Sequence, residues 1–132
     1  MHLVLTEAQR QILSIEAIDK KPNECCALLF GKKDNDKILV NEIFIAENIE
    51  KSPLNFTISN EQLIQGYKMA GDKGLEVIGI FHSHPDSDPY PSATDKKFME
   101  LNPVAWVIFS VMTKEFKAYM LESELITIPI VT

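Results

Sequence analysis

The chain has 132 residues, of which 45% are hydrophobic and 24% are charged, and its formal net charge is −6. This length and composition are typical of one folded domain, which we expect to span residues 1–132. They exclude a disordered chain and a (β/α)₈ barrel, which needs about 250 residues. The acidic balance, with Arg10 as the only arginine, argues against a nucleic-acid-binding surface.

Charged residues are spread along the whole chain. The longest stretch without Asp, Glu, Lys or Arg is residues 101–113, which is shorter than the roughly 20 apolar residues of a membrane-spanning helix. The first twenty residues carry too many charges for a secretory signal peptide. Cys25 and Cys26 are neighbours, and adjacent cysteines rarely form a disulfide bond. We therefore expect a cytoplasmic protein with reduced cysteines and no membrane contact.

The first predicted element is a helix that begins after Thr6. Thr6 with Gln9 three residues later is the signature of a capping box. Pro22 is expected to end this helix. Apolar residues recur at helical spacing and predict an apolar face made of Leu5, Ala8, Ile12 and Ile15.

Strands are expected next. The apolar run 25–31 and the Val- and Ile-rich run 37–45 each predict a strand, and residues 55–58 predict a further short one.

A second helix is expected after residue 59. Ser59 with Gln62 has the form of a second capping box, and Gly71 or Gly74 would end the helix. The residues expected to share one face of this helix are Leu63, Tyr67 and Ala70.

The second half of the chain predicts a buried strand, a stiff loop and more strands. Residues 77–81 are continuously apolar, which is typical of a central strand covered on both faces. A loop with three prolines follows, then a short helix over residues 92–101. The remaining strands are expected at residues 105–112, 116–121 and 125–131. We interpret the apolar tail as a core strand rather than an edge that pairs with a second copy. The fold class is therefore mixed α/β (α+β), a mixed sheet with helices packed against it.

The chemistry of the chain is concentrated in residues 81–95. His82 and His84 are two apart at the end of a strand, so both side chains project to the same face and can bind one metal ion. Ser92 and Asp95 are neighbours on one face of a helix start. Two histidines, a carboxylate and an open fourth position make a catalytic rather than a structural zinc set. Taken alone, Ser92 and Asp95 also fit an ordinary helix cap.

A hydrolytic metal site also needs a base. Glu24 stands at the mouth of the apolar segment 25–31, where its charged side chain has to leave the core. From the residues alone it is equally a catalytic base or a solvated loop glutamate. We interpret Asp86 and Asp88, the other carboxylates of the loop, as solvated.

Two segments, PNECCALLFG at residues 22–31 and HSHPDSDPYPSATD at residues 82–95, resemble the JAMM (MPN-plus) metalloprotease family. The intervening NIEKSPLNF, with Asn48, Pro53 and Phe56, is similar to the family's middle segment. The resemblance covers essentially the whole chain. It implies the MPN fold, a curved mixed sheet with packed helices in a layout like that of cytidine deaminases.

The resemblance also implies roles for the site residues. His82, His84 and Asp95 would bind one Zn²⁺ per chain, Glu24 would be the general base and acid, and Ser92 would stabilise the oxyanion. The expected reaction is hydrolysis of the amide bond after the Gly-Gly tail of a ubiquitin-like protein, which frees a lysine side chain.

Three alternatives stay open. The first is release of cysteine or another small adduct from a sulfur-carrier protein, as in some compact prokaryotic members of the family. The second is a non-catalytic MPN scaffold, although such relatives have typically lost metal ligands and none is lost here. The third is the oligomeric state, since the sequence is compatible with a homodimer as well as with a monomer.

Overall fold

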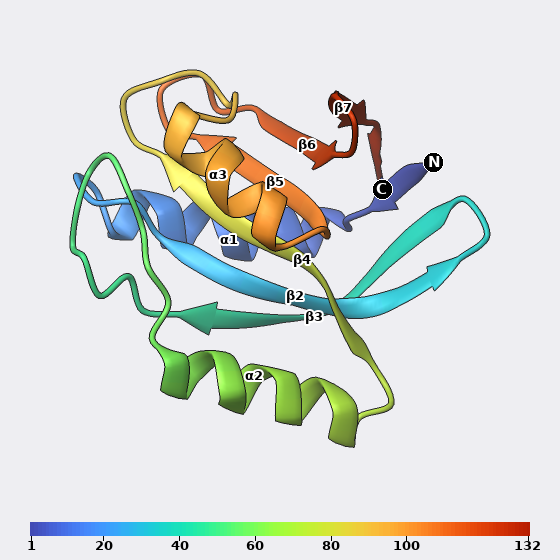
Figure 1. The fold of residues 1–132 in the computed structure, drawn as a ribbon. Helices are drawn as coiled ribbons and strands as arrows, with labels where there is room; N and C mark the ends of the chain where they lie inside the picture. The colour runs from blue at the N-terminus through green and yellow to red at the C-terminus, as the bar shows by residue number, and fades with distance from the viewer.

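One strongly curved mixed sheet contains every strand of the protein. The computed structural model describes all residues, 1–132. The strands are β1 (His2–Val4), β2 (Cys26–Asp34), β3 (Lys37–Ala46), β4 (Glu76–His84), β5 (Ala105–Ser110), β6 (Phe116–Leu121), β7 (Leu125–Ile128) and β8 (Ile130–Val131). The helices are α1 (Glu7–Asp19), α2 (Asn60–Asp72) and α3 (Ala93–Leu101), and Figure 1 shows how they surround the sheet.

The order of strands in the sheet is β7-β6-β5-β4-β2-β3-β1-β8. β4 lies in the middle, antiparallel to β2 and parallel to β5, as its continuous apolar sequence predicts. The two outermost strands, β7 and β8, are neighbours in the chain and are separated only by Pro129. The two ends of the sheet therefore meet, and the sheet is nearly a barrel. The predicted mixed α+β fold is confirmed.

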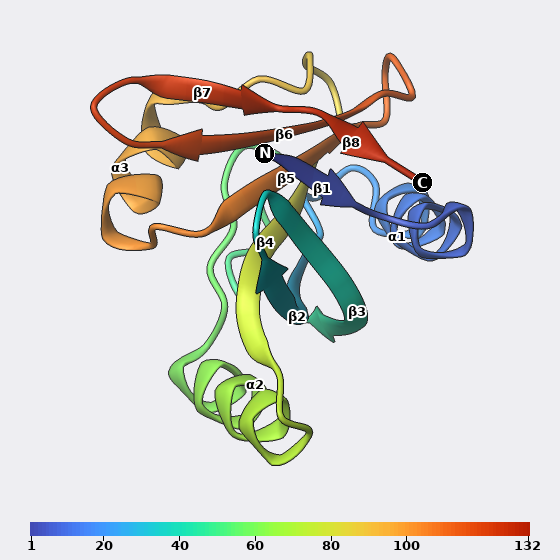
Figure 2. The same cartoon turned by 90° about the vertical axis from the view of Figure 1, so that its right-hand side faces the viewer.

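The sheet is buried on both faces. Along β2, alternate residues enter two separate core clusters, with Ala27 and Leu29 in one and Cys26 and Leu28 in the other. Helix α1 packs on the first cluster, whereas α2 and α3 pack on the second. Figure 2 shows the three helices at separate positions around the sheet. None of the helices is long and apolar enough to cross a membrane.

Helix α1 has the predicted start but buries a different face. The Thr6 side chain accepts from the Gln9 N–H at 3.1 Å, and the Gln9 side chain accepts from the Thr6 N–H at 2.9 Å. The residues that pack on the sheet are Leu13 and Ala17, whereas Ile12 and Ile15, predicted on the apolar face, are about half exposed. The Gln9 amide donates to the Val40 carbonyl at 2.9 Å. This bond fixes the rotation of the helix, so that the Gln9 side faces the sheet.

Helix α2 departs from its prediction in two ways. Ser59 caps the Gln62 N–H at 3.1 Å, but the Gln62 side chain accepts from the Glu47 N–H instead of completing a capping box. Gly66 is buried beside Ala70, and Tyr67 is exposed. A side chain at Gly66 would collide with Leu28, because an added Cβ would lie 2.5 Å from its Cδ1 atom. The sheet therefore approaches the helix along its smallest residue.

The other predicted elements are confirmed with one exception. Residues 55–58 are irregular rather than a strand, because their backbone folds around the side chain of Asn48. Helix α3 begins at the predicted cap, Ser92. The C-terminal tail divides at Pro129 into β7, which pairs with β6, and β8, which pairs with β1. Only Ile128 of the tail is buried in the core. Because β7 and β8 are the outermost strands of the sheet, the interpretation of the tail as a core strand holds only for this residue. His2 also lies in the sheet, in β1.

Candidate metal centre and its surroundings

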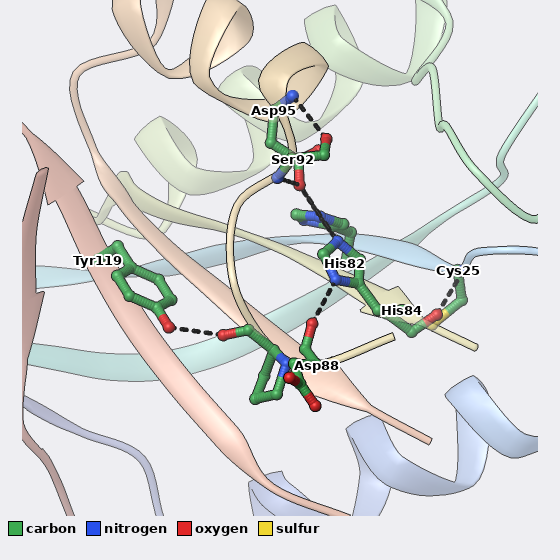
Figure 3. Close-up of polar contacts among 9 residues, drawn as sticks. Cys25, His82, His84, Asp88, Ser92, Asp95 and Tyr119 are labelled. Carbon is green, nitrogen blue, oxygen red and sulfur yellow. Dashed lines mark hydrogen bonds and ion pairs between the residues drawn. The ribbon is translucent and has the colours of Figure 1, made fainter. Parts of the chain in front are cut away.

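The end of β4 and the start of α3 bring three metal-binding side chains together. His82 and His84 lie at the C-terminal end of β4, and both are buried. Asp95 is the third residue of α3 and is also buried. Figure 3 shows the two histidines and Asp95 gathered at this end of the strand. In the chain, ten residues separate His84 from Asp95, yet the three side chains form one cluster that could hold a metal ion.

The three ligand atoms form an almost equilateral triangle. His82 Nε2 lies 3.1 Å from His84 Nε2, and each of these atoms lies 3.1 Å from Asp95 Oδ2. In a tetrahedral zinc site with bonds of about 2.0 Å, ligand atoms lie about 3.3 Å apart. The donor set and its spacing therefore fit a divalent metal of the zinc type with one position left open.

The two histidines are oriented by different means. The ring nitrogen Nδ1 of His84 donates to the Asp88 carbonyl at 2.8 Å, which leaves Nε2 free to bind a metal. His82 Nδ1 is buried and has no hydrogen-bond partner in the protein. Its ring is instead held by aromatic packing, stacked on Phe56 with centroids 4.8 Å apart and in edge contact with Trp106 at 5.9 Å.

Charge at the cluster centres on Asp95. Burial favours the neutral carboxyl group, but hydrogen bonds from His82, His84 and the Ser92 N–H outweigh it and hold the pKa of Asp95 well below its usual range. Burial lowers the pKa of His82. Burial acts in the same direction on His84, but its hydrogen bonds with Asp95 and Asp88 leave its pKa raised. Without a metal, the cluster therefore holds an ionised carboxylate against two imidazoles.

The start of α3 fixes Asp95 and Ser92 relative to each other. The Ser92 N–H donates to Asp95 Oδ2 at 2.9 Å, and the Asp95 N–H donates to Ser92 Oγ at 3.0 Å. The predicted cap and the predicted metal ligand are therefore one arrangement, not alternatives. The Ser92 oxygen accepts in this bond, so its hydroxyl hydrogen can still be donated elsewhere. Ser92 is exposed beside the buried cluster.

The loop over residues 85–91 is held by side chains. Because three of its residues are prolines, it has few N–H groups for bonds of its own. Three successive carbonyls, those of residues 87–89, each accept from a side chain. The donors are Ser110 Oγ at 2.7 Å and two groups that Figure 3 shows, His84 Nδ1 at 2.8 Å and the Tyr119 hydroxyl at 2.6 Å. Asp86 and Asp88 are exposed on this loop, although Asp88 contributes its carbonyl to the site.

Glu24 lies two residues before the start of β2 and beside the cluster. In the antiparallel pairing of β2 with β4, Cys26 lies opposite His82, so continuing the register by two residues places Glu24 opposite His84. Its side chain is 4% exposed, and the Oε1 atom is buried without a hydrogen-bond partner. Burial, with smaller contributions from Asp95 and Glu50, raises the pKa of Glu24 to about 8. It is thus not a solvated loop glutamate, and it can carry a proton near neutral pH.

A cavity of about 510 Å³ opens beside Glu24. It lies between the C-terminal end of α1, the end of β3 and the segment that follows β3. Charged residues of both signs line it, among them Glu16, Lys20, Glu47 and Lys51. Cys25 also lines the cavity, and both cysteines are free and buried, as predicted.

The backbone around Glu24 is held by residues to which sequence analysis gives no role. The Glu24 N–H donates to the Ser52 carbonyl at 2.8 Å, and the Glu24 carbonyl accepts from Asn48 Nδ2 at 3.0 Å. The N–H of the next residue, Cys25, donates to Ser83 Oγ at 2.9 Å. Ser83 stands between His82 and His84 in β4. In the sequence, Asn48 is marked only because it belongs to the segment 48–56 that is similar to the family. Ser83 is marked only by its place between the two histidines.

Comparisons with known proteins agree with this geometry. Residues 6–122 match the family described as prokaryotic homologs of the JAB domain. The chain is 32% identical over 110 residues to the desampylase of Pyrococcus furiosus, which covers 83% of this chain and 75% of that protein. It is 26% identical over 89 residues to the CysO-cysteine peptidase of Mycobacterium tuberculosis, covering 67% of this chain and 60% of that one. Both relatives are hydrolases, as expected for this chain.

Solved structures share the fold. A protein from Desulfitobacterium hafniense has a TM-score of 0.88 and 28% identity, with 98% of this chain and 91% of that chain covered. A JAB1/MPN domain protein from Archaeoglobus fulgidus has a TM-score of 0.64 and 22% identity over the full length of both chains. The MPN fold expected from the resemblance is confirmed, and the chain belongs to the prokaryotic JAB family of hydrolases.

Proposed function

We propose that the protein is a zinc-dependent isopeptidase that hydrolyses the amide bond after the C-terminal Gly-Gly tail of a ubiquitin-like protein and frees a lysine side chain. The observation that carries the proposal is the triangle of ligand atoms from His82, His84 and Asp95 beside the buried, unpartnered carboxyl group of Glu24. The relatives named desampylase and CysO-cysteine peptidase support the substrate class.

His82, His84 and Asp95 are the residues that would hold the zinc ion. When bound, zinc would supply a Lewis acid that makes a water molecule acidic and polarises the scissile carbonyl. Asp95 adds negative charge, because its hydrogen bonds with His82, His84 and the Ser92 N–H hold its pKa well below the usual range. With three protein ligands, one position of a tetrahedral zinc ion would stay open for water.

Glu24 would act as general base and then as general acid. Its carboxyl group takes a proton from the attacking water and delivers it to the nitrogen of the leaving amine. Burial places its pKa near 8 in the metal-free protein, so both proton uptake and proton release are accessible around neutral pH. A carboxyl group that accepted several hydrogen bonds would be held ionised and would return the proton less readily.

Ser92 would donate its hydroxyl hydrogen to the oxyanion that forms at the carbonyl carbon. Its oxygen is fixed by the Asp95 N–H, so the donor is positioned before the reaction begins. A preorganised donor stabilises charge that appears only in the transition state. The Gly-Gly tail suits such a site, because glycines let the substrate backbone approach closely.

A second candidate reaction is release of an amino acid with a free carboxylate, such as cysteine, from a sulfur-carrier protein. The observation that favours it is the cavity beside Glu24, because Glu24 would deliver its proton to the nitrogen of the leaving group and this cavity is open space next to it. Of its two lysines, Lys20 pairs with Glu16 at 3.5 Å, whereas Lys51 belongs to no ion pair. Lys51 is therefore free to bind a carboxylate, which an isopeptide-linked lysine side chain does not offer.

The test is a cleavage assay with the purified, zinc-loaded protein. One substrate is a ubiquitin-like protein joined through its Gly-Gly tail to a lysine side chain, and the other is the same protein joined to cysteine. Chelator-sensitive cleavage of the first supports the isopeptidase. Preference for the second, with a KM that rises in Lys51→Glu, supports the alternative. Failure to cleave either substrate with zinc bound would refute the substrate class.

A further inference from the structure

The segment over residues 47–59, which joins β3 to α2, contacts both halves of the site. We propose that this segment sets the position of Glu24 relative to the metal-binding residues, with Asn48 and Phe56 as positioning residues. The inference rests on the proposed function, because it takes Glu24 as the base. It concerns how the base and the metal ligands are held relative to each other, by a segment that contains neither.

The side chain of Asn48 organises the segment. It is 9% exposed and uses its full hydrogen-bonding capacity. Its Oδ1 atom accepts from the Glu50 N–H and the Thr57 N–H, both at 3.1 Å, which closes the segment on itself. Its Nδ2 atom donates to the Asn55 carbonyl and to the Glu24 carbonyl, both at 3.0 Å. The accepting side therefore shapes the segment, and the donating side also ties it to Glu24.

Glu24 depends on this segment because it lies outside the strand ladder. Strand β2 begins at Cys26, so β3 and β4 provide no ladder partner for the Glu24 backbone. Both of its backbone groups bond to the segment instead, the carbonyl to Asn48 and the N–H to Ser52. The backbone is thus fixed, whereas the carboxyl oxygen Oε1 stays without a protein partner. A general base needs a backbone that is held in place and a carboxyl group that is free to exchange a proton.

The other end of the segment holds a metal ligand. Phe56, which is 8% exposed, stacks on the His82 ring at an interplanar angle of 24°. His82 Nδ1 has no hydrogen bond in the protein to orient the ring, in contrast to His84. Packing against Phe56 and Trp106 therefore sets the direction of His82 Nε2.

The two contacts are coupled within the segment. The Ile49 N–H donates to the Thr57 carbonyl at 3.0 Å, directly next to Asn48 on one side and Phe56 on the other. Together with the two bonds from Asn48 to Thr57 and Asn55, this link leaves little freedom between Asn48 and Phe56. A shift of the segment would move the base and a metal ligand at once, and a misplacement of about 1 Å costs about a hundredfold in rate.

The first test variant is Asn48→Asp. It keeps an oxygen that can accept from Glu50 and Thr57, and it loses the N–H donors to Glu24 and Asn55. We expect kcat to fall by about 10- to 100-fold with KM changed less than about twofold. Zinc affinity should fall less than in the Phe56 variant described next, because Asn48 reaches the metal ligands only through the segment. The amide of Glu24 should exchange its hydrogen about tenfold faster or more, a readout that does not require activity.

The second test variant is Phe56→Leu. It keeps an apolar side chain but removes the ring that stacks on His82, so the zinc dissociation constant should rise by about 10- to 100-fold. Competition with a chelator measures this directly. The matched control is Leu54→Ala, at a position in the same segment that is 75% exposed; it should leave kcat, zinc affinity and Glu24 exchange unchanged. If the new carboxylate prevents Asn48→Asp from folding, the neutral Asn48→Ser replaces it with the same expectations.

The outcomes separate this inference from the proposed function. If the Glu24 amide in the Asn48 variant exchanges at the wild-type rate, Asn48 does not position Glu24. If Phe56→Leu binds zinc with wild-type affinity, Phe56 does not position His82. A wild-type protein that binds zinc but cleaves no substrate would refute the proposed function, while the exchange and zinc measurements would still decide the positioning roles.

Discussion

Glu24 is held in an unfavourable place for an acidic side chain. Its carboxyl group is buried and unpartnered, and burial of an ionised group without a partner destabilises a folded protein. The protein accepts this cost at a position beside the metal-binding cluster. A carboxyl group that contributes nothing to stability but stands next to reactive groups is expected to serve chemistry.

Replacing Glu24 by Gln should separate catalysis from metal binding. The amide keeps the shape of the side chain but cannot take up and return a proton, so kcat should fall by about 10²- to 10⁴-fold. Zinc content, measured by metal analysis of the purified variant, should stay at the wild-type level. Wild-type turnover in Glu24→Gln would show that another group is the base.

The same residue predicts how stability depends on pH in the zinc-free protein. Burial raises the pKa of Glu24 from 4.5 to about 8, so between these values the folded state keeps a proton that the unfolded state has lost. Stability should therefore fall as pH rises from about 4.5 to 8, by at most about 5 kcal/mol at about 1.4 kcal/mol for each pH unit. Urea unfolding at pH 5 and pH 8 measures this change. Glu24→Gln lacks this contribution, and a difference between the two proteins that is constant with pH would contradict the prediction.

Ser92 offers a test of its two roles. Ser92→Ala should lower kcat by about 10²-fold or more if the hydroxyl stabilises the oxyanion. Loss of the bond to the Asp95 N–H should also cost about 1 kcal/mol of folding stability, as for other helix caps. Steady-state kinetics and denaturant unfolding report the two effects separately. A stability loss with unchanged kcat would leave Ser92 as a helix cap only.

Sequence spacing predicts the residues that act through short-range geometry. The pair His82 and His84 shares a face because strands have a period of two, and Ser92 with Asp95 shares a helix start. Asn48 and Phe56 act across 24 and 26 residues of chain, on Glu24 and on His82. Such contacts follow from the tertiary path of the chain, and no local period encodes them.

At the scale of elements, close approach between backbones decides which residues fit. Gly31 lies where the pairing of β2 with β3 shifts its register, and an added Cβ there would lie 1.7 Å from the Leu39 carbonyl oxygen. The obstacle is backbone of the neighbouring strand, which cannot move without breaking the ladder. By contrast, a Cβ added to Gly71 in α2 would have no atom within 4 Å.

These two glycines make a matched pair of variants. Gly31→Ala should destabilise the protein by about 2 kcal/mol or more through overpacking. Gly71→Ala should change stability by a gain of up to about 1 kcal/mol, because alanine favours a helix. Denaturant unfolding measures both. Equal stability of the two variants would show that the strands separate freely at Gly31.

The rotation of α1 illustrates what an apolar pattern leaves undetermined. The helix has two sets of apolar residues, and the β-branched isoleucines Ile12 and Ile15 suggested the wrong one. The buried face is the one that carries Leu13 and Ala17, with Gln9 bonded to Val40 in β3. The polar contact of Gln9 with a distant strand lies on the same face as the buried Leu13 and Ala17. The existence and length of the helix could be predicted, but the face it buries could not.

At the scale of the whole molecule, the metal centre ties together two parts of the chain that pack on the same sheet. The ligands come from β4 and from α3, so bound zinc stabilises only the folded state. At about 100 times the dissociation constant, it should add about 2.7 kcal/mol, or a rise in Tm of about 10 °C for a domain of this size. A chelator should reverse the rise. Asp95→Asn should show a smaller response to zinc, and an equal response would place the metal elsewhere.

The loop with the carbonyls of residues 87–89 bears on when the proposed metal site would be filled. Ser110, His84 and Tyr119 hold this loop through the chain's own hydrogen bonds, so its conformational entropy is lost during folding and not during metal capture. The ligands then stand ready in a folded apoprotein. Zinc bound at the proposed site would leave and return without refolding, and the supply of the metal, rather than the speed of folding, would set how many molecules are active.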